Sequence, residues 1–464
     1  MRRSFYLKFA LQTLVFTVVS HLITKQQKNQ FLKLMFYSLI FKRVTMKTII
    51  RNSTYEKVSK MKKQKSYNPI KPSMFWRCLI RLISIPGLMA AKFTYKKINM
   101  EKFNKKEPCL ILMNHSCFLD LQIAQTIMFP NPLNIVCTSD GFVGKNLLMR
   151  LIGCIPTNKF VNDVSLIRKM KYTLTELKSN ILMYPEASYS FDGTATVLPE
   201  SLFKCIKFLG VPVVMIKTCG AFSRNPLYNN LQVRKKVPIS ADVTYLLSKD
   251  DIERMSVPEI ASVIKNEFSF DNFKWQQENK IKIDDDFRAD NLNRVLFKCP
   301  ACKTEGKTVG KGTTLICTHC NKEYELTEYG FMKAKNGDTE FSHIPDWFNW
   351  QREEVKKEIL ENTYSLNVPV EIFMMVNTKA IYKVGEGILQ HSKNGFVLDG
   401  CDGKLHYKQK PKSSYSLYSD YYWYEIGDVI CIGDMKTLYY CFPKTDNDVV
   451  AKTRIATEEI FKLS

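Results

Sequence analysis

Between residues 107 and 250, short apolar runs alternate with stretches whose apolar residues recur at helical spacing. Four runs have the length and composition of buried strands: residues 109–113, 133–138, 180–184 and 211–217. The stretches with helical spacing are residues 119–128, 147–151, 164–178 and 202–209. Strands that alternate with helices are typical of an α/β fold, because the helices cover the faces of one sheet. We therefore predict an α/β domain over residues 74–290.

Positive charge is concentrated near the N-terminus. Residues 1–106 hold 24 of the 68 Lys and Arg residues but only two of the 45 acidic residues, Glu56 and Glu101, which accounts for most of the formal net charge of +23. A basic segment interleaved with apolar residues suits an anionic membrane surface, whereas a nucleic-acid groove would spread its charge over the fold. A solvated Lys-rich tail is the alternative. We expect membrane lipid as a partner, a location at the cytoplasmic face of a membrane, and no nucleic-acid partner.

Two apolar segments lie in or next to the basic N-terminal part, residues 1–73. Residues 9–24 carry no charge but are few for a membrane-spanning helix; they resemble the core of a signal peptide without a cleavage site after it. Translation from Met46 is a further option, so the protein is expected to be either peripheral or N-terminally anchored. Residues 74–93 place Arg77 and Arg81 among apolar side chains and predict an interfacial helix interrupted near Pro86. The alternative is an ordinary amphipathic helix docked on the core.

A histidine and an aspartate follow the first apolar run. Residues 111–120 read Ile-Leu-Met-Asn-His-Ser-Cys-Phe-Leu-Asp, with His115 and Asp120 five positions apart. On a continuous helix this separation is a rotation of about 140°, so His115 must lie in the turn before a helix and Asp120 in its first turns. An aspartate bonded to one ring nitrogen fixes the tautomer and leaves the other nitrogen to take a proton from an alcohol. The pair predicts a general base; a loop histidine with satisfied hydrogen bonds is the alternative.

Three more blocks follow the His115 block in a fixed order. With the His115 block counted as the first, the second reads Gly153-Cys-Ile-Pro-Thr-Asn-Lys159, the third Tyr184-Pro-Glu-Ala-Ser-Tyr-Ser190 and the fourth Gly210-Val-Pro-Val-Val214. Together with Asn114-His115-x4-Asp120, the order and spacing over roughly residues 75–250 resemble the glycerolipid acyltransferases that make phosphatidic acid. The resemblance implies an O-acyltransferase that moves a fatty acyl group from acyl-CoA or acyl-carrier protein to a lysophospholipid, with 1-acylglycerol 3-phosphate as the expected acceptor.

The same resemblance implies roles for individual residues. His115 would be the base, Asp120 its partner, and Glu186 would position the acceptor or the surroundings of His115, with a structural carboxylate bonded to backbone amides as the alternative. Backbone amides near Glu186 and Ala187 would stabilise the oxyanion. By position in the blocks, the substrate-binding residues would be Asn114, Gly153, Lys159, Pro185, Ala187 and Ser188.

Three positions depart from the pattern of that family. Lys159 stands where an arginine is usual, Tyr189 replaces the arginine of the third block, and Ala187 replaces a glycine, which matters if that position needs a positive φ. The departures leave the reaction type intact. They bear on the acceptor, because phosphate recognition separates lysophosphatidate from other lysolipids.

Four cysteines form a compact module within residues 296–328. Cys299 and Cys302 are separated by two residues, as are Cys317 and Cys320, with 14 residues between the pairs. This is the spacing of a zinc ribbon, in which four thiolates close the shell of a structural Zn²⁺. Because zinc ribbons also bind macromolecules, the rival hypothesis is a catalytically inactive binding or adaptor protein at a membrane or a nucleic acid.

The last part of the chain, residues 340–464, has a different texture. Residues 341–366 have helical character and predict a linker helix. Short strands are predicted at residues 370–376, 381–384, 396–398, 405–408, 423–432 and 438–442, followed by a helix at 449–463. We expect a β-rich C-terminal domain, a small barrel capped by the last helix.

Overall fold

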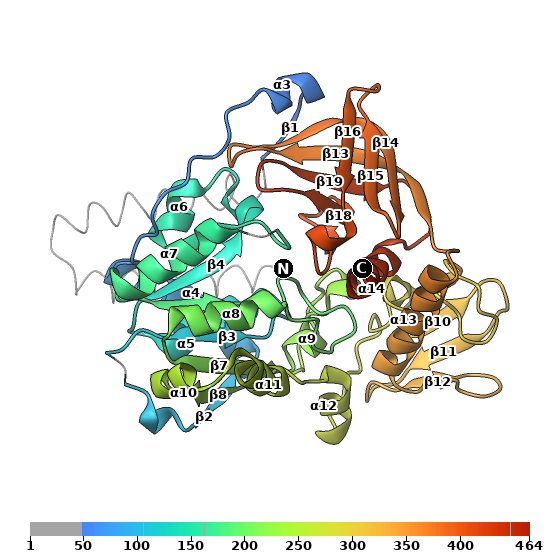
Figure 1. Cartoon of the computed structure of the whole chain (residues 1–464). Helices are drawn as coiled ribbons and strands as arrows, with labels where there is room; N and C mark the ends of the chain where they lie inside the picture. The colour runs from blue at the N-terminus through green and yellow to red at the C-terminus, as the bar shows by residue number, and fades with distance from the viewer. Residues whose placement is uncertain (1–48, 105, 162, 446) are drawn as a thin grey trace, which may run out of the picture. The chain divides into compact units, whose positions relative to one another are not determined.

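The computed structural model describes residues 49–464 apart from residues 105, 162 and 446, and residues 50–464 form one compact unit. The expectations for residues 1–48, including the uncharged run 9–24, lie outside the described residues. The unit has the predicted fold class: an α/β part, a small cysteine-bearing sheet and a β-rich C-terminal part (Figure 1).

The α/β part is built on a seven-stranded sheet with the order β2-β8-β7-β3-β6-β4-β5. All neighbouring strands run parallel except β7 and β8, which are antiparallel. The strands are β2 (Thr94–Ile98), β3 (Leu110–Met113), β4 (Leu133–Thr138), β5 (Cys154–Thr157), β6 (Asn180–Met183), β7 (Val213–Cys219) and β8 (Ser240–Leu247). The four predicted strands are confirmed, and β3 lies in the interior of the sheet.

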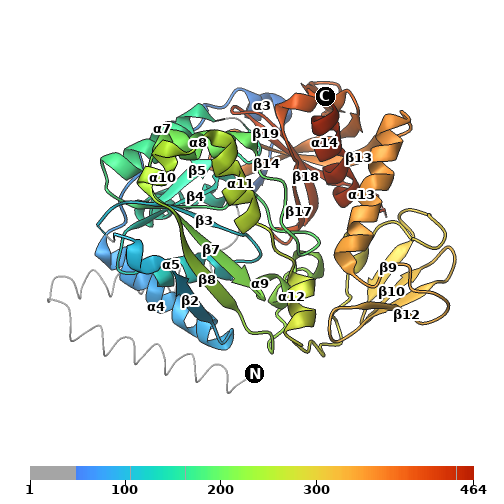
Figure 2. The ribbon, with the colours of Figure 1, turned by 60° about the horizontal axis from the view of Figure 1, so that its bottom comes forward.

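Helices cover both faces of this sheet. Along β3, Ile111 and Met113 join a core with α4 and α5, whereas Leu110 and Leu112 join a second core with α7, α8 and α11, because successive side chains of a strand point to opposite faces. Figure 2 shows the two groups of helices on opposite sides of the sheet. The helices are α4 (Met74–Ala90), α5 (Leu119–Met128), α6 (Asn146–Leu151), α7 (Val164–Thr175), α8 (Glu200–Leu209), α9 (Ala221–Arg224), α10 (Lys249–Arg254), α11 (Val257–Glu267) and α12 (Asn272–Glu278).

The predicted interruption near Pro86 is wrong, because α4 continues through it to Ala90. A proline inside a helix removes one backbone hydrogen bond, and the packing of α4 against α5 offsets that loss. Arg77 donates to the carbonyl oxygen of Pro130, and the Arg81 guanidinium lies over the Phe129 ring, so both arginines contact the segment that follows α5. Among the described residues, none of the helices is both long and apolar enough to cross a membrane.

The cysteine module is a four-stranded antiparallel sheet with the order β12-β11-β10-β9. Its strands are β9 (Thr308–Lys311), β10 (Thr314–Cys317), β11 (Glu323–Leu326) and β12 (Met332–Ala334). The linker helix α13 (Ile344–Leu360) follows, and its Trp347 packs edge-on against Tyr324 of β11 with ring centroids 4.9 Å apart. The module and α13 therefore share one core.

The C-terminal part is a single hydrogen-bonded series of strands, β16-β15-β14-β13-β19-β18-β17, followed by α14 (Val450–Leu463). Its ends, β16 and β17, do not pair with each other, so hydrogen bonds do not close the expected barrel. Before the α/β part, β1 (Ile50–Asn52) adds to β14 and α3 (Tyr55–Ser59) follows it. The strands are β13 (Leu366–Met375), β14 (Ile381–Ser392), β15 (Gly395–Gly400), β16 (Leu405–Gln409), β17 (Tyr418–Trp423), β18 (Gly427–Gly433) and β19 (Leu438–Pro443).

One strand prediction in this part is wrong. Residues 423–432 were expected to form one strand, but they contain the turn between the antiparallel strands β17 and β18. Tyr424 and Glu425 have φ values of 46° and 62°, which reverse the chain although neither residue is a glycine.

Candidate active site

The turn after β3 carries His115. Asn114, the residue after β3, is fully buried and ties this end of the strand to β7: its Nδ2 donates to the carbonyl oxygen of Thr218 (3.0 Å), and its Oδ1 accepts from the Thr218 amide (2.8 Å). Asn114 therefore fixes the point from which the His115 turn begins. It does not line the cavity described below.

The His115 imidazole contacts Asp120 as the spacing predicted. Nδ1 of His115 lies 3.0 Å from Oδ2 of Asp120, which is fully buried in the first turn of α5. The same carboxylate oxygen accepts from the amides of Ser116 (2.6 Å) and Cys117 (2.9 Å). A neutral imidazole protonated on Nδ1 donates to Asp120, which leaves the Nε2 lone pair free to accept a proton.

Two tyrosines of the third sequence block enclose the His115 ring. Tyr184 stacks on it with ring centroids 4.0 Å apart, and Tyr189 contacts it at 4.3 Å with an interplanar angle of 45°. Burial lowers the pKa of His115 below its ordinary value, and the hydrogen bond to Asp120 opposes this shift. The ring is therefore neutral at neutral pH, the state that a general base requires.

Glu186 is buried behind the His115 turn. Its Oε1 accepts from the backbone amide of His115 (3.3 Å), and its Oε2 accepts from the amide (3.2 Å) and hydroxyl (3.1 Å) of Thr196. Burial raises the pKa of Glu186 to about 7. Glu186 does not line the cavity, so the geometry fits a carboxylate that positions the backbone of His115 rather than one that contacts the acceptor.

A cavity of about 1220 Å³ opens beside the His115 ring. It exceeds the roughly 300–1,000 Å³ that is usual for ligand pockets. Much of its wall is apolar and comes from the α/β part, for example Leu121, Ile152, Ile167 and Leu198. Such a wall suits an acyl chain.

Of the residues assigned to substrate binding, Lys159, Pro185 and Ala187 line the cavity, whereas Asn114, Gly153 and Ser188 do not. Gly153 has a φ of 91°, and a Cβ atom there would lie 3.1 Å from both the Leu133 carbonyl oxygen and the Pro72 ring. Its role is to let the chain turn tightly into β5.

Ala187 adopts a φ of 55°, so the position does require the left-handed conformation that a glycine takes more easily. Its amide donates to the carbonyl oxygen of Tyr184 (3.0 Å). This amide is therefore not available to stabilise an oxyanion, because the turn already uses its hydrogen, and the expectation for the other backbone amides near Glu186 stays a prediction.

Sequence reasoning missed the contribution of the C-terminal part to the cavity. Tyr415, Tyr418, Asp420, Trp423 and Tyr424 all line it. The only sequence signal for this contribution was the aromatic run at residues 421–424, because alternate side chains of a strand can be buried where two parts of a fold meet.

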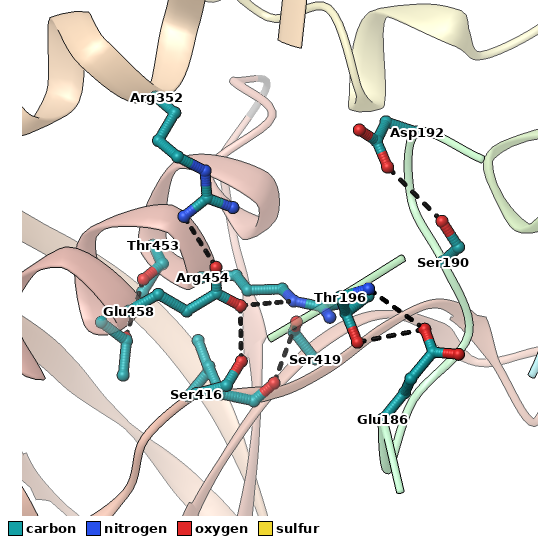
Figure 3. A network of polar contacts seen from close by, with 12 residues as sticks. Glu186, Ser190, Asp192, Thr196, Arg352, Ser416, Ser419, Thr453, Arg454 and Glu458 are labelled. Carbon is teal, nitrogen blue, oxygen red and sulfur yellow. Dashed lines mark hydrogen bonds and ion pairs between the residues drawn. The ribbon is translucent and has the colours of Figure 1, made fainter. Parts of the chain in front are cut away.

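A buried polar network joins α14 to the same cavity wall (Figure 3). Glu458 of α14 lines the cavity and accepts from Ser416 Oγ (2.6 Å), Arg352 Nη1 (2.8 Å) and Arg454 Nε (3.3 Å). The Arg454 guanidinium also lies 4.5 Å above the ring of Phe191, in the loop between Glu186 and Thr196. The C-terminal helix thus packs against the loop that holds the His115 turn.

The four cysteines of the module come together. The sulfurs of Cys299 and Cys320 are 3.7 Å apart, as are those of Cys302 and Cys317, and all four lie within 4.8 Å of one another. Four thiolates around a tetrahedral ion with metal–sulfur bonds of about 2.3 Å would be about 3.8 Å apart. The cluster can therefore bind a metal ion.

Comparison with known proteins assigns the α/β part to a class. Residues 95–217 match the family model described as Acyltransferase. The match identifies this segment as an acyltransferase domain. The segment contains the His115–Asp120 turn and Glu186, and the resemblance found in the sequence is confirmed at the level of the domain family.

A solved structure similar to the chain is that of the 1-acyl-sn-glycerophosphate (LPA) acyltransferase PlsC from Thermotoga maritima. The two are 14% identical with a TM-score of 0.32, and the match covers 41% of this chain and 78% of that one. Comparison with curated protein sequences gives no match.

Proposed function

We propose that the protein is an O-acyltransferase that moves a fatty acyl group from an acyl thioester, acyl-CoA or acyl-carrier protein, to the free hydroxyl of a lysophospholipid. The proposed acceptor is 1-acylglycerol 3-phosphate, and the product is phosphatidic acid. The observation that carries this proposal is the 3.0 Å contact between His115 Nδ1 and Asp120, at the wall of a large cavity in an acyltransferase domain.

The geometry supports a direct transfer without a covalent enzyme intermediate. His115 Nε2 takes the proton of the acceptor hydroxyl while its oxygen attacks the thioester carbonyl. The new ester C–O bond forms, the C–S bond breaks, and the leaving thiolate takes the proton from the imidazolium. Asp120 stabilises that imidazolium through Nδ1, and the two tyrosine rings keep the imidazole oriented.

The cysteine cluster supports a structural role for a bound metal, which we propose to be Zn²⁺. Four protein sulfurs fill a tetrahedral shell and leave no position for water or substrate. The backbone next to the cluster is fixed to α13, because Trp347 Nε1 donates to the carbonyl oxygen of Lys298 (2.9 Å) and the Lys298 amide donates to Gln351 Oε1 (2.9 Å). Zn²⁺ would therefore stabilise the module on which α13 packs.

The exposed side of α4 supports a peripheral site at the cytoplasmic face of a membrane. Five large apolar side chains project from it, within an arc of about 100° on a helical projection. They are Met74, Phe75, Leu82, Ile85 and Met89, and each is more than a third exposed. A solvent-facing apolar stripe next to a basic segment matches the chemistry of an anionic lipid surface.

The proposal is tested by incubating the purified protein with radiolabelled acyl-CoA or acyl-carrier protein and a panel of lysolipids that share one acyl chain. The expected result is a radiolabelled phosphatidic acid from 1-acylglycerol 3-phosphate, identified by mass spectrometry. Transfer only to acceptors without a phosphate monoester would overturn the proposed acceptor. Transfer to no acceptor with either donor would overturn the enzymatic function.

A further inference from the structure

Lys159 of the second sequence block is held by the C-terminal part. Its Nζ lies 4.3 Å from the centre of the Tyr418 ring, a cation–π contact between the loop after β5 and strand β17. Tyr418 is itself fixed, because its hydroxyl donates to Asp140 Oδ2 (2.6 Å) and accepts from Trp423 Nε1 (2.9 Å). The ring that receives the ammonium therefore has one defined orientation.

A carboxylate of the same strand lies at the same cavity wall as the Lys159 ammonium. Asp420 lies two residues after Tyr418, and Asp420, Tyr418 and Lys159 all line the cavity. Burial lowers the pKa of Lys159, and Asp420 is the neighbour that most opposes this shift. In turn, burial raises the pKa of Asp420 to about 6, and the Lys159 charge opposes that shift. Each of the two groups therefore favours the charged form of the other.

This arrangement matters for an anionic acceptor, because Tyr189 has replaced the arginine that the third block would supply. Lys159 is the cation of the sequence blocks that lines the cavity. Asp140 already accepts from the Tyr418 hydroxyl, whereas within the described part of residues 50–464 Asp420 accepts only from the Tyr421 amide (3.0 Å). Lys145, Lys412 and Lys462 line the cavity too, but a phosphate that binds Lys159 does so against the field of the Asp420 carboxylate.

We propose that Tyr418 and Asp420 make the C-terminal domain part of the acceptor site: Tyr418 is a positioning residue that holds the Lys159 ammonium at the cavity wall, and Asp420 limits the affinity for a phosphate monoester by competing for that ammonium. The inference rests on the proposed transfer to a phosphate-bearing lysolipid. It predicts that changes at the two residues alter acceptor affinity in opposite directions.

The test compares two ligands with the same acyl chain, 1-acylglycerol 3-phosphate as the substrate and neutral 1-acylglycerol as a competitor. Used as a competitor, the neutral lipid reports its affinity whether or not it is acylated. Tyr418→Leu removes the ring and should raise KM for the phosphate acceptor about fivefold, the value of a cation–π contact of about 1 kcal/mol. Asp420→Asn should lower that KM about threefold. Neither variant should change the inhibition constant of the neutral lipid.

Controls on the same hairpin separate these effects from a change in fold. Tyr418→Phe keeps the ring and should therefore keep most of the preference for the phosphate acceptor that Tyr418→Leu loses. Tyr422→Leu and Glu425→Gln alter exposed side chains that do not line the cavity, and they match the two test variants in chemistry. If Tyr418→Leu does not fold, as judged by circular dichroism, Asp420→Asn alone decides the question.

The inference is overturned if either folded variant changes the affinities for both ligands equally, or if Asp420→Asn leaves KM for the phosphate acceptor unchanged. These outcomes differ from failure of the proposed function, in which the unaltered protein transfers no acyl group to 1-acylglycerol 3-phosphate.

Discussion

Tyr184 stacks on the His115 imidazole with ring centroids 4.0 Å apart and an interplanar angle of 22°. Tyr189 contacts the ring as well, and Asp120 binds Nδ1. An imidazole held in this way has little freedom to rotate, so the direction of its Nε2 lone pair is set before substrate binds. Preorganisation of this kind is what makes a single base effective.

Replacement of Asp120 should slow the transfer without abolishing it. Asp120→Asn keeps the size of the side chain but removes the charge that stabilises the imidazolium, and kcat should fall by about 10²–10⁴. A matched control is Asp399→Asn, because Asp399 pairs with His406 in an exposed His–Asp contact on β15 and β16. The Asp120 variant should be compared with it by steady-state kinetics. If Asp120→Asn loses no more activity than Asp399→Asn, the role of Asp120 in stabilising the imidazolium is contradicted.

Glu186 should make stability depend on pH. Its pKa of about 7 in the folded protein lies above the ordinary value of 4.5, so the folded state holds a proton that the unfolded chain releases. The contribution of this proton to the free energy of unfolding is fully present below pH 4.5 and is lost as pH rises through about 7. Relative to Glu186→Gln, the unaltered protein should lose roughly 1–3 kcal/mol over that range in urea unfolding. A difference between the two proteins that stays constant with pH would count against this account.

Much of the α/β part could be predicted because its signals are local. The bounds of β4 and α5 match the predicted ranges, and the five-residue spacing alone placed His115 in a turn and Asp120 in a helix. Three strands were missed for identifiable reasons. β2 is an exposed edge strand that carries Lys96 and Lys97, β5 has four residues including Pro156, and β8 mixes polar and apolar residues without a clean run.

A cavity lined by both the α/β part and the C-terminal part could not be predicted from such patterns. The hydrogen bond between Asp140 and Tyr418 joins residues 278 positions apart, and periodicity carries no information on contacts of that separation. The sequence blocks also named Asn114, Gly153 and Ser188 as substrate-binding residues, yet none of them lines the cavity. A residue next to a site residue can serve only to fix the conformation of the backbone there.

Metal removal should unfold the cysteine module locally. The unaltered protein should contain about one Zn²⁺ per chain, and Cys302→Ser should lose it. Trp347 is fully buried and donates to the backbone next to Cys299, so metal loss should shift its fluorescence to longer wavelength. Cys205→Ser alters a cysteine outside the cluster and serves as the control. Full metal content in the Cys302 variant would refute the assignment of that ligand.

The apolar stripe of α4 should bind anionic lipid. Ile85→Ser combined with Met89→Ser should weaken binding to phosphatidylglycerol vesicles by at least about tenfold, since burial of each side chain contributes roughly 1.5 kcal/mol or more. Ile83 is 65% exposed on the same helix but points away from the stripe, so Ile83→Ser is the matched control. Equal binding by both variants in vesicle sedimentation would exclude this face as the docking surface.

The central claim is that His115 is the base of an acyl transfer. Its most direct test compares His115→Ala with His406→Ala, which removes the exposed histidine paired with Asp399. Both proteins are checked for fold by circular dichroism and then assayed with acyl thioester and 1-acylglycerol 3-phosphate. Transfer by His115→Ala should be at least about 10²-fold slower, with His406→Ala close to the unaltered protein. A folded His115→Ala protein that transfers at the unaltered rate would contradict the claim.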